Sequence, residues 1–289
     1  MNIMKKLLIS VVTLVSLFGT QSASAWGSIG HHCAAYIAEQ HLTPEAKEKC
    51  RYYLNHTLSY YAMWMDRWRG VQEFEAINNG HSVRTTDNGR KITWEASTTK
   101  AIGATVTTPP GRAMGHLVNA YKELGNGNYK NLPDSVVRQR LINMIHYVAD
   151  MHCPSHCGLP ESMYAPASKY DLKKNGKFAN FHGLWDGSPG FKRKNLTVKK
   201  YAEMVDNVSP KVSKKWQKGL EQKDIQKGID SWGKIIIKNA IEAYAIIPEG
   251  TDIAKLSNEQ VEQLHNLADH AVLVGAYRLA YVLNTIFKE

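Results

Sequence analysis

Residues Leu141–Cys157 read LINMIHYVADMHCPSHC, and this stretch combines a helical pattern with side chains that bind metals. Pro133-Asp134 supplies a helix start signal, and Pro154 ends the helix. Apolar residues recur at three- and four-residue spacings on one helix face: Val137, Leu141, Ile142, Ile145, Val148 and Ala149. We therefore expect a helix whose apolar face belongs to the core.

The polar residues of this stretch have spacings that suit metal ions. His146 and Asp150 lie four residues apart, so a helix presents both from one face. The proline that follows lets His156 turn toward the same site or a neighbouring one. Imidazole and carboxylate together are ligands for zinc and similar metals. A single pair with this spacing is more often a surface hydrogen bond, but His182 and Asp186 repeat the spacing, which favours metal binding.

The first 25 residues have the pattern of a secretory signal peptide. Lys5 and Lys6 precede an apolar run from Leu7 to Phe18, and Ala23-Ser24-Ala25 forms a cleavage site. The run is too short to span a bilayer, and no later stretch is long and apolar enough. We expect residues 26–289 to be exported, to the periplasm or beyond, as one domain and a monomer without membrane insertion.

The chain is basic, with a formal net charge of +10, of which the two signal-peptide lysines contribute two. This charge favours polyanionic partners such as nucleic acid or anionic lipid. On charge alone, a basic solvated surface that binds no particular partner explains the net charge equally well.

Four cysteines in an exported chain predict disulfides rather than metal ligands. Cys33–Cys50 would join the first two helices, and Cys153–Cys157 would close the tight loop after the metal-binding helix. Four cysteines allow three pairings, and the sequence does not choose among them.

The periodicity of the remaining chain predicts a mainly α fold with a loop-rich section at about residues 71–110. Within that section Lys91–Ser97 alternates as a short strand pair would. Helices are expected at Ile29–His41, from Pro44 through Tyr61 toward Asp66, and at about Gly111–Leu124, Asp134–His152, Thr197–Val208, Lys223–Tyr244 and Ser257–Phe287.

The ligand-type residues, in their order along the chain, resemble the S1/P1 nuclease family of secreted zinc enzymes related to bacterial phospholipase C. The residues that carry the resemblance are Trp26, His31, Asp66, Arg69, His81, His146, Asp150, His156, His182 and Asp186. The resemblance is strongest over Trp26–Asp186. Beyond Asp186 it consists only of a similar helical pattern that continues to the C-terminus. It implies a multi-helix phospholipase C/P1 nuclease-like fold and an endonuclease that hydrolyses single-stranded DNA and RNA to 5′-phosphorylated products.

The family pattern also implies three zinc ions. The first would be held by Asp66, His81, His146 and Asp150. The second would be held by the amino group and carbonyl of Trp26, by His31, and by Asp150 as a bridge. The third would be held by His156, His182 and Asp186. Arg69 would contact the phosphate and stabilise charge in the transition state, so Arg69 and Asp150 are the expected catalytic residues.

Two positions depart from the family pattern. The family commonly has an aspartate or asparagine three residues after the histidine at position 81, where it orients the nucleophilic water, and often an aromatic residue directly after that histidine, where a base stacks. This chain has Arg84 and Ser82 there. Ser82 is a candidate for substrate binding. The two departures leave two questions unanswered by the sequence: which residue orients the water, and which base is preferred.

Two other functions compete with the nuclease. A phospholipase C-like phosphodiesterase shares the metal core, but there a glutamate often holds the last ligand position and the first histidine lies further from the N-terminus. Asp186 and the short gap from Trp26 to His31 favour the nuclease. A zinc-loaded protein that binds nucleic acid without cutting it is the second alternative, because Arg84 replaces a group near the catalytic water.

Overall fold

A computed structural model of the protein describes residues 26–68, 71, 80–101, 104–221 and 223–288. These residues form a mainly α-helical fold, as the sequence predicts. The helices are α1 (Ser28–Gln40), α2 (Pro44–Leu54), α3 (Leu58–Tyr61), α4 (Trp64–Arg67), α6 (Ala113–Leu124), α7 (Asp134–Asp150), α8 (Phe181–Asp186), α9 (Val198–Val205), α10 (Pro210–Gln217), α11 (Ile225–Asp230), α12 (Gly233–Ile246) and α13 (Asn258–Ile286). Short 3-10 helices are η2 (Asn128–Asn131), η3 (Pro154–His156), η4 (Ser188–Gly190) and η5 (Ile253–Lys255).

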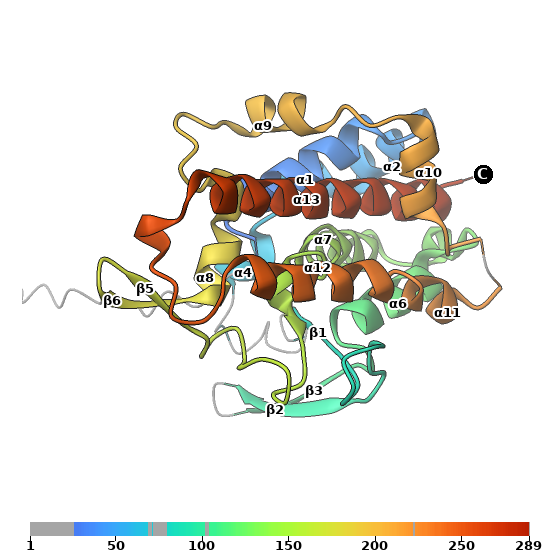
Figure 1. The fold of residues 1–289 in the computed structure, drawn as a ribbon. Coiled ribbons are helices and arrows are strands. Elements are labelled where there is room, and N and C mark those ends of the chain that lie inside the picture. The colour runs from blue at the N-terminus through green and yellow to red at the C-terminus, as the bar shows by residue number, and fades with distance from the viewer. Residues whose placement is uncertain (1–25, 69–70, 72–79, 102–103, 222, 289) are drawn as a thin grey trace, which may run out of the picture.

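The long helix α13 runs through the middle of the molecule, and α1, α7, α10 and α12 pack against it (Figure 1). It starts at a capping box, in which Ser257 and Gln260 satisfy each other's backbone N–H groups. Its apolar side chains enter two neighbouring cores, with Ala271 in one and Leu279 in the other. Neither α13 nor any other described helix is apolar enough over sufficient length to cross a membrane.

The described strands form three short pairs. β1 (Val83–Arg84) and β4 (Cys157–Gly158) are parallel and join distant parts of the chain. β2 (Ser97–Ala101) and β3 (Ala104–Thr108) form an antiparallel hairpin, as do β5 (Asp171–Lys174) and β6 (Lys177–Asn180). The expected strand pair at Lys91–Ser97 was misplaced, because the hairpin begins only at Ser97 and Ile92 makes a single bridge to Thr85.

The helix expected from Pro44 toward Asp66 is divided into α2, α3 and α4. α2 begins as predicted, with the Thr43 side chain accepting from the N–H of Ala46 and Pro44 in the first turn. It ends at Asn55, whose φ of 56° is left-handed, and Thr57 then caps α3. The break between α3 and α4 leaves the carbonyl of Ala62 outside a helical ladder, where it serves the site described below.

Lys223–Tyr244 was expected to be one helix, and the structure divides it into α11 and α12. The side chain of Ser231 donates to the carbonyl of Gly228 at 2.6 Å and so competes with the helical backbone bonds. The next residue, Trp232, is buried and donates from its indole to the carbonyl of Lys218. The sequence also gave no expectation of α8 or α10 as helices.

The expected disulfides are wrong, because all four cysteines are free and buried. Cys33 on α1 packs into one apolar core and Cys50 on α2 into the other. Cys153 and Cys157, on either side of η3, are divided between the two cores in the same way. In each expected pair the two thiols therefore serve different cores as small apolar side chains.

Candidate metal centre

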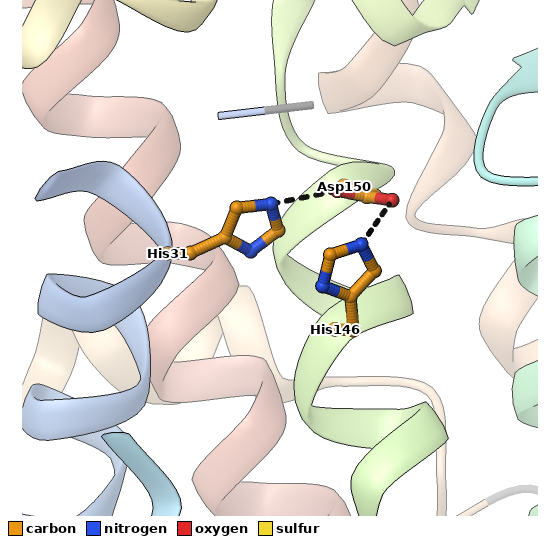
Figure 2. Close-up of side chains that lie close together, drawn as sticks. All are labelled: His31, His146 and Asp150. Carbon is orange, nitrogen blue, oxygen red and sulfur yellow. Dashed lines mark ion pairs between the residues drawn. The ribbon is translucent and has the colours of Figure 1, made fainter. Parts of the chain in front are cut away.

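Helices α1 and α7 bring the first part of the site together. His31 on α1 and His146 and Asp150 on α7 point toward one another in the interior (Figure 2). All three are buried, and the imidazole rings of the two histidines stack at 4.3 Å between centroids. The four-residue spacing on α7 thus places histidine and carboxylate on the same inward face, as the sequence predicts.

Asp150 presents its two carboxylate oxygens to different histidines. Oδ1 lies 3.1 Å from Nε2 of His31. Oδ2 lies 2.7 Å from Nδ1 of His81 and 3.2 Å from Nε2 of His146. The side chain of Asp150 is fully buried, so a single carboxylate connects three imidazole groups inside the protein.

Asp66, on the short helix α4, completes this cluster. Its Oδ1 lies 3.6 Å from Nε2 of His146, and its Oδ2 lies 3.9 Å from Nε2 of His31. Ligand atoms of Asp66, His81 and His146 converge on a second potential metal position that shares His146 with the first. Because the break before α4 turns the chain here, Asp66 faces α7 although it is remote from it in sequence.

A further group forms where η3 meets α8. His182 and Asp186 lie one turn apart on α8, with 3.6 Å between Nε2 and Oδ1. His156 at the end of η3 approaches them, and its Nε2 lies 2.6 Å from Nε2 of His182. The pairing of β1 with β4 holds this group beside the first cluster, because His81 and His156 come just before those strands.

Backbone carbonyls orient two of the histidines. Nδ1 of His146 donates to the carbonyl of Ala62 at 2.8 Å, so its Nε2 faces the carboxylates. Nδ1 of His156 donates in the same way to the carbonyl of His81 at 3.2 Å, and its Nε2 faces His182. Such fixing of the second ring nitrogen is typical of metal-ligating histidines.

Burial and mutual charge shift the titration of these groups. Burial alone would lower the pKa of His146, but the carboxylate of Asp150 raises it to about 9. Burial lowers the pKa of His156 to about 3, which keeps that imidazole neutral. Burial and then the charge of Asp150 raise the pKa of Asp186 well above its usual range. Carboxylates crowded together in a dry interior are stabilised by a cation among them.

The first cluster also leaves buried polar atoms without hydrogen bonds. Both ring nitrogens of His31 and Oδ1 of Asp150 have no hydrogen-bond partner among the described residues, and their 3.1 Å contact does not have the direction of a hydrogen bond. Two ligands of one tetrahedral zinc, each ~2.1 Å from it, are ~3.4 Å apart. Most separations above are close to that value, although the His156–His182 and His81–Asp150 contacts are shorter. The residues therefore fit metal ions.

The sequence predicts Trp26 as a ligand through its backbone, and the structure describes its surroundings. The side chain is fully buried, and the N–H of Gly27 donates to the carbonyl of Asp186 at 2.6 Å. A Cβ atom at Gly30 would lie only 2.9 Å from that of Trp26, so glycine allows the close packing. Residue 26 is thus tied to the helix that carries Asp186.

A cavity of about 650 Å³ opens at the side of the centre. His81, His156 and His182 line one part of it, and Ser82 lines it too. Arg69, the expected phosphate ligand, lies outside the described residues. Arg112 also lines the cavity, although no sequence pattern predicted it there. The only signal was a basic residue after Pro109-Pro110-Gly111 at the start of a helix.

The side chain of Ser155 was also missed. Its hydroxyl donates to Oδ1 of Asp186 at 3.3 Å, and the thiol of Cys153 lies 3.7 Å from the same oxygen. Both residues stand in the LINMIHYVADMHCPSHC stretch, but no local pattern in the sequence says that they would meet α8. They position a carboxylate of the third group.

Comparison with known proteins gives one family and three relatives. The family model described as S1/P1 Nuclease matches residues 26–288. Nuclease S1 from Aspergillus oryzae is 23% identical over 300 residues, which cover 96% of this chain and 97% of that protein. Nuclease P1 from Penicillium citrinum and Nuclease PA3 from a Penicillium species are each 23% identical over 168 residues, which cover 56% of this chain and 57% of either protein.

Proposed function

Because the chain belongs to the S1/P1 nuclease family and is thus a phosphodiester-hydrolysing endonuclease, we propose that it cuts single-stranded DNA and RNA at a centre of three zinc ions. The products carry 5′-phosphates. The observation that carries the proposal is the convergence of three groups of buried and half-buried ligand-type residues beside one open cavity. Phosphodiester hydrolysis needs such a placement, since the ions must reach both the substrate and water.

The ligands divide among the ions as follows. Asp66, His81 and His146 hold one ion together with Asp150, and His31 would hold a second together with Asp150. One carboxylate oxygen of Asp150 lies toward His31, and the other lies toward His81 and His146. This arrangement supports a role for Asp150 as a bridge. His156, His182 and Asp186 hold the third ion. The position of His156 and His182 in the cavity wall supports contact with the leaving group.

When bound, the zinc ions supply Lewis acidity, which polarises the phosphoryl oxygens and makes water nucleophilic near neutral pH. The protein's own residues prepare this chemistry. Burial alone would raise the pKa of Asp150, but the charge of His146 and the contacts with His31 and His81 hold it well below its usual range, so this group is a carboxylate. The carbonyl of Ala62 holds the ring of His146 in one tautomer and one orientation.

Two further parts of the proposal concern the N-terminus and Arg69. Residues 1–25 are removed on export, residues 26–289 form one monomeric domain, and the free amino group and carbonyl of Trp26 bind the ion held by His31. The hydrogen bond between Gly27 and Asp186 supports this placement, because it fixes the residue next to the centre. Arg69, three residues after Asp66, binds the phosphate and stabilises its charge in the transition state.

The experiment is a comparison of substrates with protein that begins at Trp26. Single-stranded DNA, RNA, duplex DNA and phosphatidylcholine are each incubated with the protein, with the protein plus chelator, and after zinc is restored. We expect zinc-dependent cleavage of both single-stranded polymers and far slower cleavage of the duplex. Hydrolysis of phosphatidylcholine alone would assign the centre to a phospholipase, and binding of nucleic acid without cleavage would make it a binding protein.

A matched pair of variants ties the activity to the centre. Asp150→Asn changes a carboxylate that meets histidines inside the site, and Asp206→Asn changes one that accepts from His41 at 2.9 Å elsewhere in the protein. We expect the first variant to lose activity by orders of magnitude and the second to keep it. Equal activities in the two variants would exclude Asp150 from catalysis.

A further inference from the structure

Two arginines line the cavity beside the metal centre. Arg84 stands on β1, and Arg112 directly precedes α6. His81, a ligand of the proposed centre, lines the same cavity. A group bound between the arginines would therefore lie next to the phosphate that is cut.

The backbone and the β2–β3 hairpin hold Arg112 in place. Its φ of 53° lies in the left-handed region, which a side chain other than glycine rarely adopts, so the surrounding structure imposes this conformation. Its Nη1 donates to Oγ of Ser97 at 2.8 Å, and Ser97 in turn pairs with Thr108 across the hairpin. Its Nε is buried and has no hydrogen-bond partner among the described residues. The guanidinium thus has an unused donor in a position where water does not reach it.

Arg84 adds a second positive charge at the same place. Arg84 and Arg112 line the same cavity, and burial followed by the charge of Arg84 lowers the pKa of Arg112. Arg84 is exposed, and its side chain has no salt bridge or hydrogen bond to the described residues. Like charges that share a cavity are stabilised by an anion between them.

Acidic residues of the cavity do not neutralise this pair. Asp87 and Glu161 also line it. Within the described part of the chain, no ion pair of 4.0 Å or less joins either carboxylate to Arg84 or Arg112. The two arginines therefore remain available to an anionic ligand.

We propose that Arg84 and Arg112 together bind a second phosphodiester of the polynucleotide, next to the one that is hydrolysed. This inference rests on the proposed nuclease function and adds a determinant of substrate length to it. Guanidinium groups match the geometry of phosphate oxygens and keep their charge at all physiological pH values. Phosphate contacts of this kind position the chain without reading its bases. Binding energy from such a remote group helps to place the reacting phosphate.

The test compares short substrates that differ in the number of phosphates. Thymidine dinucleotide, TpT, has only the phosphate that is cut, and TpTpT has one more internal phosphodiester. We expect kcat/KM of the zinc-loaded enzyme to be about tenfold higher for TpTpT, since hydrogen bonds to a charged group contribute on that order. In Arg84→Gln and Arg112→Gln this ratio should fall to about two, the statistical value for a substrate with two cleavable phosphodiesters. Arg90→Gln changes an exposed arginine outside the cavity and should leave the ratio unchanged.

Three outcomes would overturn the proposal. The first is an unchanged ratio in both cavity variants, and the second is an equal loss for the two substrates. The third is a gain for pTpT, which carries a terminal phosphate, without a gain for TpTpT. If the wild-type enzyme cleaved neither these substrates nor single-stranded DNA, the nuclease function itself would fail. The arginine site is then tested by measuring the binding of a cleavage-resistant phosphorothioate oligothymidylate. The slope of the logarithm of its binding constant against the logarithm of salt concentration should become shallower by about 0.7 in either variant.

Discussion

Oδ1 of Asp150 lies 3.1 Å from Nε2 of His31, although the two residues come from different helices, α7 and α1. The second oxygen of the same carboxylate faces His81 and His146. One side chain therefore connects the two groups of ligands near the α7 helix. The third group lies apart, on η3 and α8.

Removing Asp150 should cost more metal than removing any other single ligand. Asp150→Ala takes a ligand from two ions at once, whereas Asp186→Ala takes one from the third ion only. We expect the first variant to lose about two zinc ions per chain and the second about one, by the proposed ligand sets. Elemental analysis of freshly purified protein measures this. A protein that kept its metal in Asp150→Ala and lost all of it in Asp186→Ala would reverse the assignment.

One extra residue before Trp26 should abolish most of the activity. An added methionine moves the free amino group by ~3.5 Å, beyond the zinc–nitrogen bonding distance of ~2.1 Å. The nitrogen left at Trp26 would be an amide, whose lone pair is delocalised. Activity should fall by orders of magnitude and return after proteolytic trimming back to Trp26.

The rival role for Trp26 is that of a buried anchor for α1, since its side chain is fully buried. An anchor predicts a tolerant N-terminus and a damaging Trp26→Ala. Full activity and full zinc content in the extended protein would therefore contradict the ligand role. Trp26→Phe, which keeps the amine and an aromatic ring, serves as the control and should bind zinc.

The cysteines should behave as four unreactive thiols. Burial raises the pKa of the Cys157 thiol to about 12 and also raises those of Cys33, Cys50 and Cys153. A raised pKa keeps the thiols protonated at neutral and mildly alkaline pH, and the thiolate is the reactive form. We expect no reaction with a thiol reagent in the native protein and four reactive groups after denaturation without reductant. No reactive groups after denaturation would show that disulfides form.

Acid should destabilise the fold through His152. Its Nδ1 donates to the carbonyl of Val148, and its Nε2 accepts from Arg278 at 2.7 Å. Burial, with the charge of Arg278, holds the pKa of His152 well below the ordinary 6.5. The unfolded chain therefore binds a proton below pH 6.5 that the folded protein does not, and the free energy of unfolding decreases there by up to about 1.4 kcal/mol per pH unit.

Urea unfolding between pH 7.5 and 5.5 measures this effect. Glutamine at position 152 can donate and accept like the neutral imidazole but does not titrate. We expect His152→Gln to depend less on pH than the wild-type protein, with the difference confined to values below 6.5. Parallel pH profiles for the two proteins would exclude His152 as the source.

The helix of the central stretch was predictable because its signal is local. Val137 to Ala149 repeat at helical spacing, and Asp150 follows His146 by one turn, so both the helix and the shared face of these two residues could be inferred. The repeated spacing at His182 and Asp186 placed these two residues on one face even though α8 was not expected as a helix, whereas their grouping with His156 came from the family resemblance. The two side chains lie on the same face because a six-residue helix is long enough to align residues four apart.

Other features depended on contacts that no local pattern records. The carbonyl of Ala62 reaches His146 only because Asn55 and Thr57 break the expected helix and turn the chain. Pairing of β1 with β4 involves two residues on each strand, too few for a recognisable alternation. Arg112 lines the cavity with its backbone in a left-handed conformation, which the local sequence does not predict. The even number of cysteines suggested disulfides. The structure contradicts this because the two thiols of each expected pair lie in different cores.

The most direct test of the zinc centre is a titration of chelator-treated protein that begins at Trp26. Zinc is added in steps, and cleavage of single-stranded DNA and bound zinc per chain are measured on the same samples. We expect activity to rise to a plateau at about three zinc ions per chain, by the proposed ligand sets. Full activity with one zinc ion per chain, or with none, would contradict the three-ion centre.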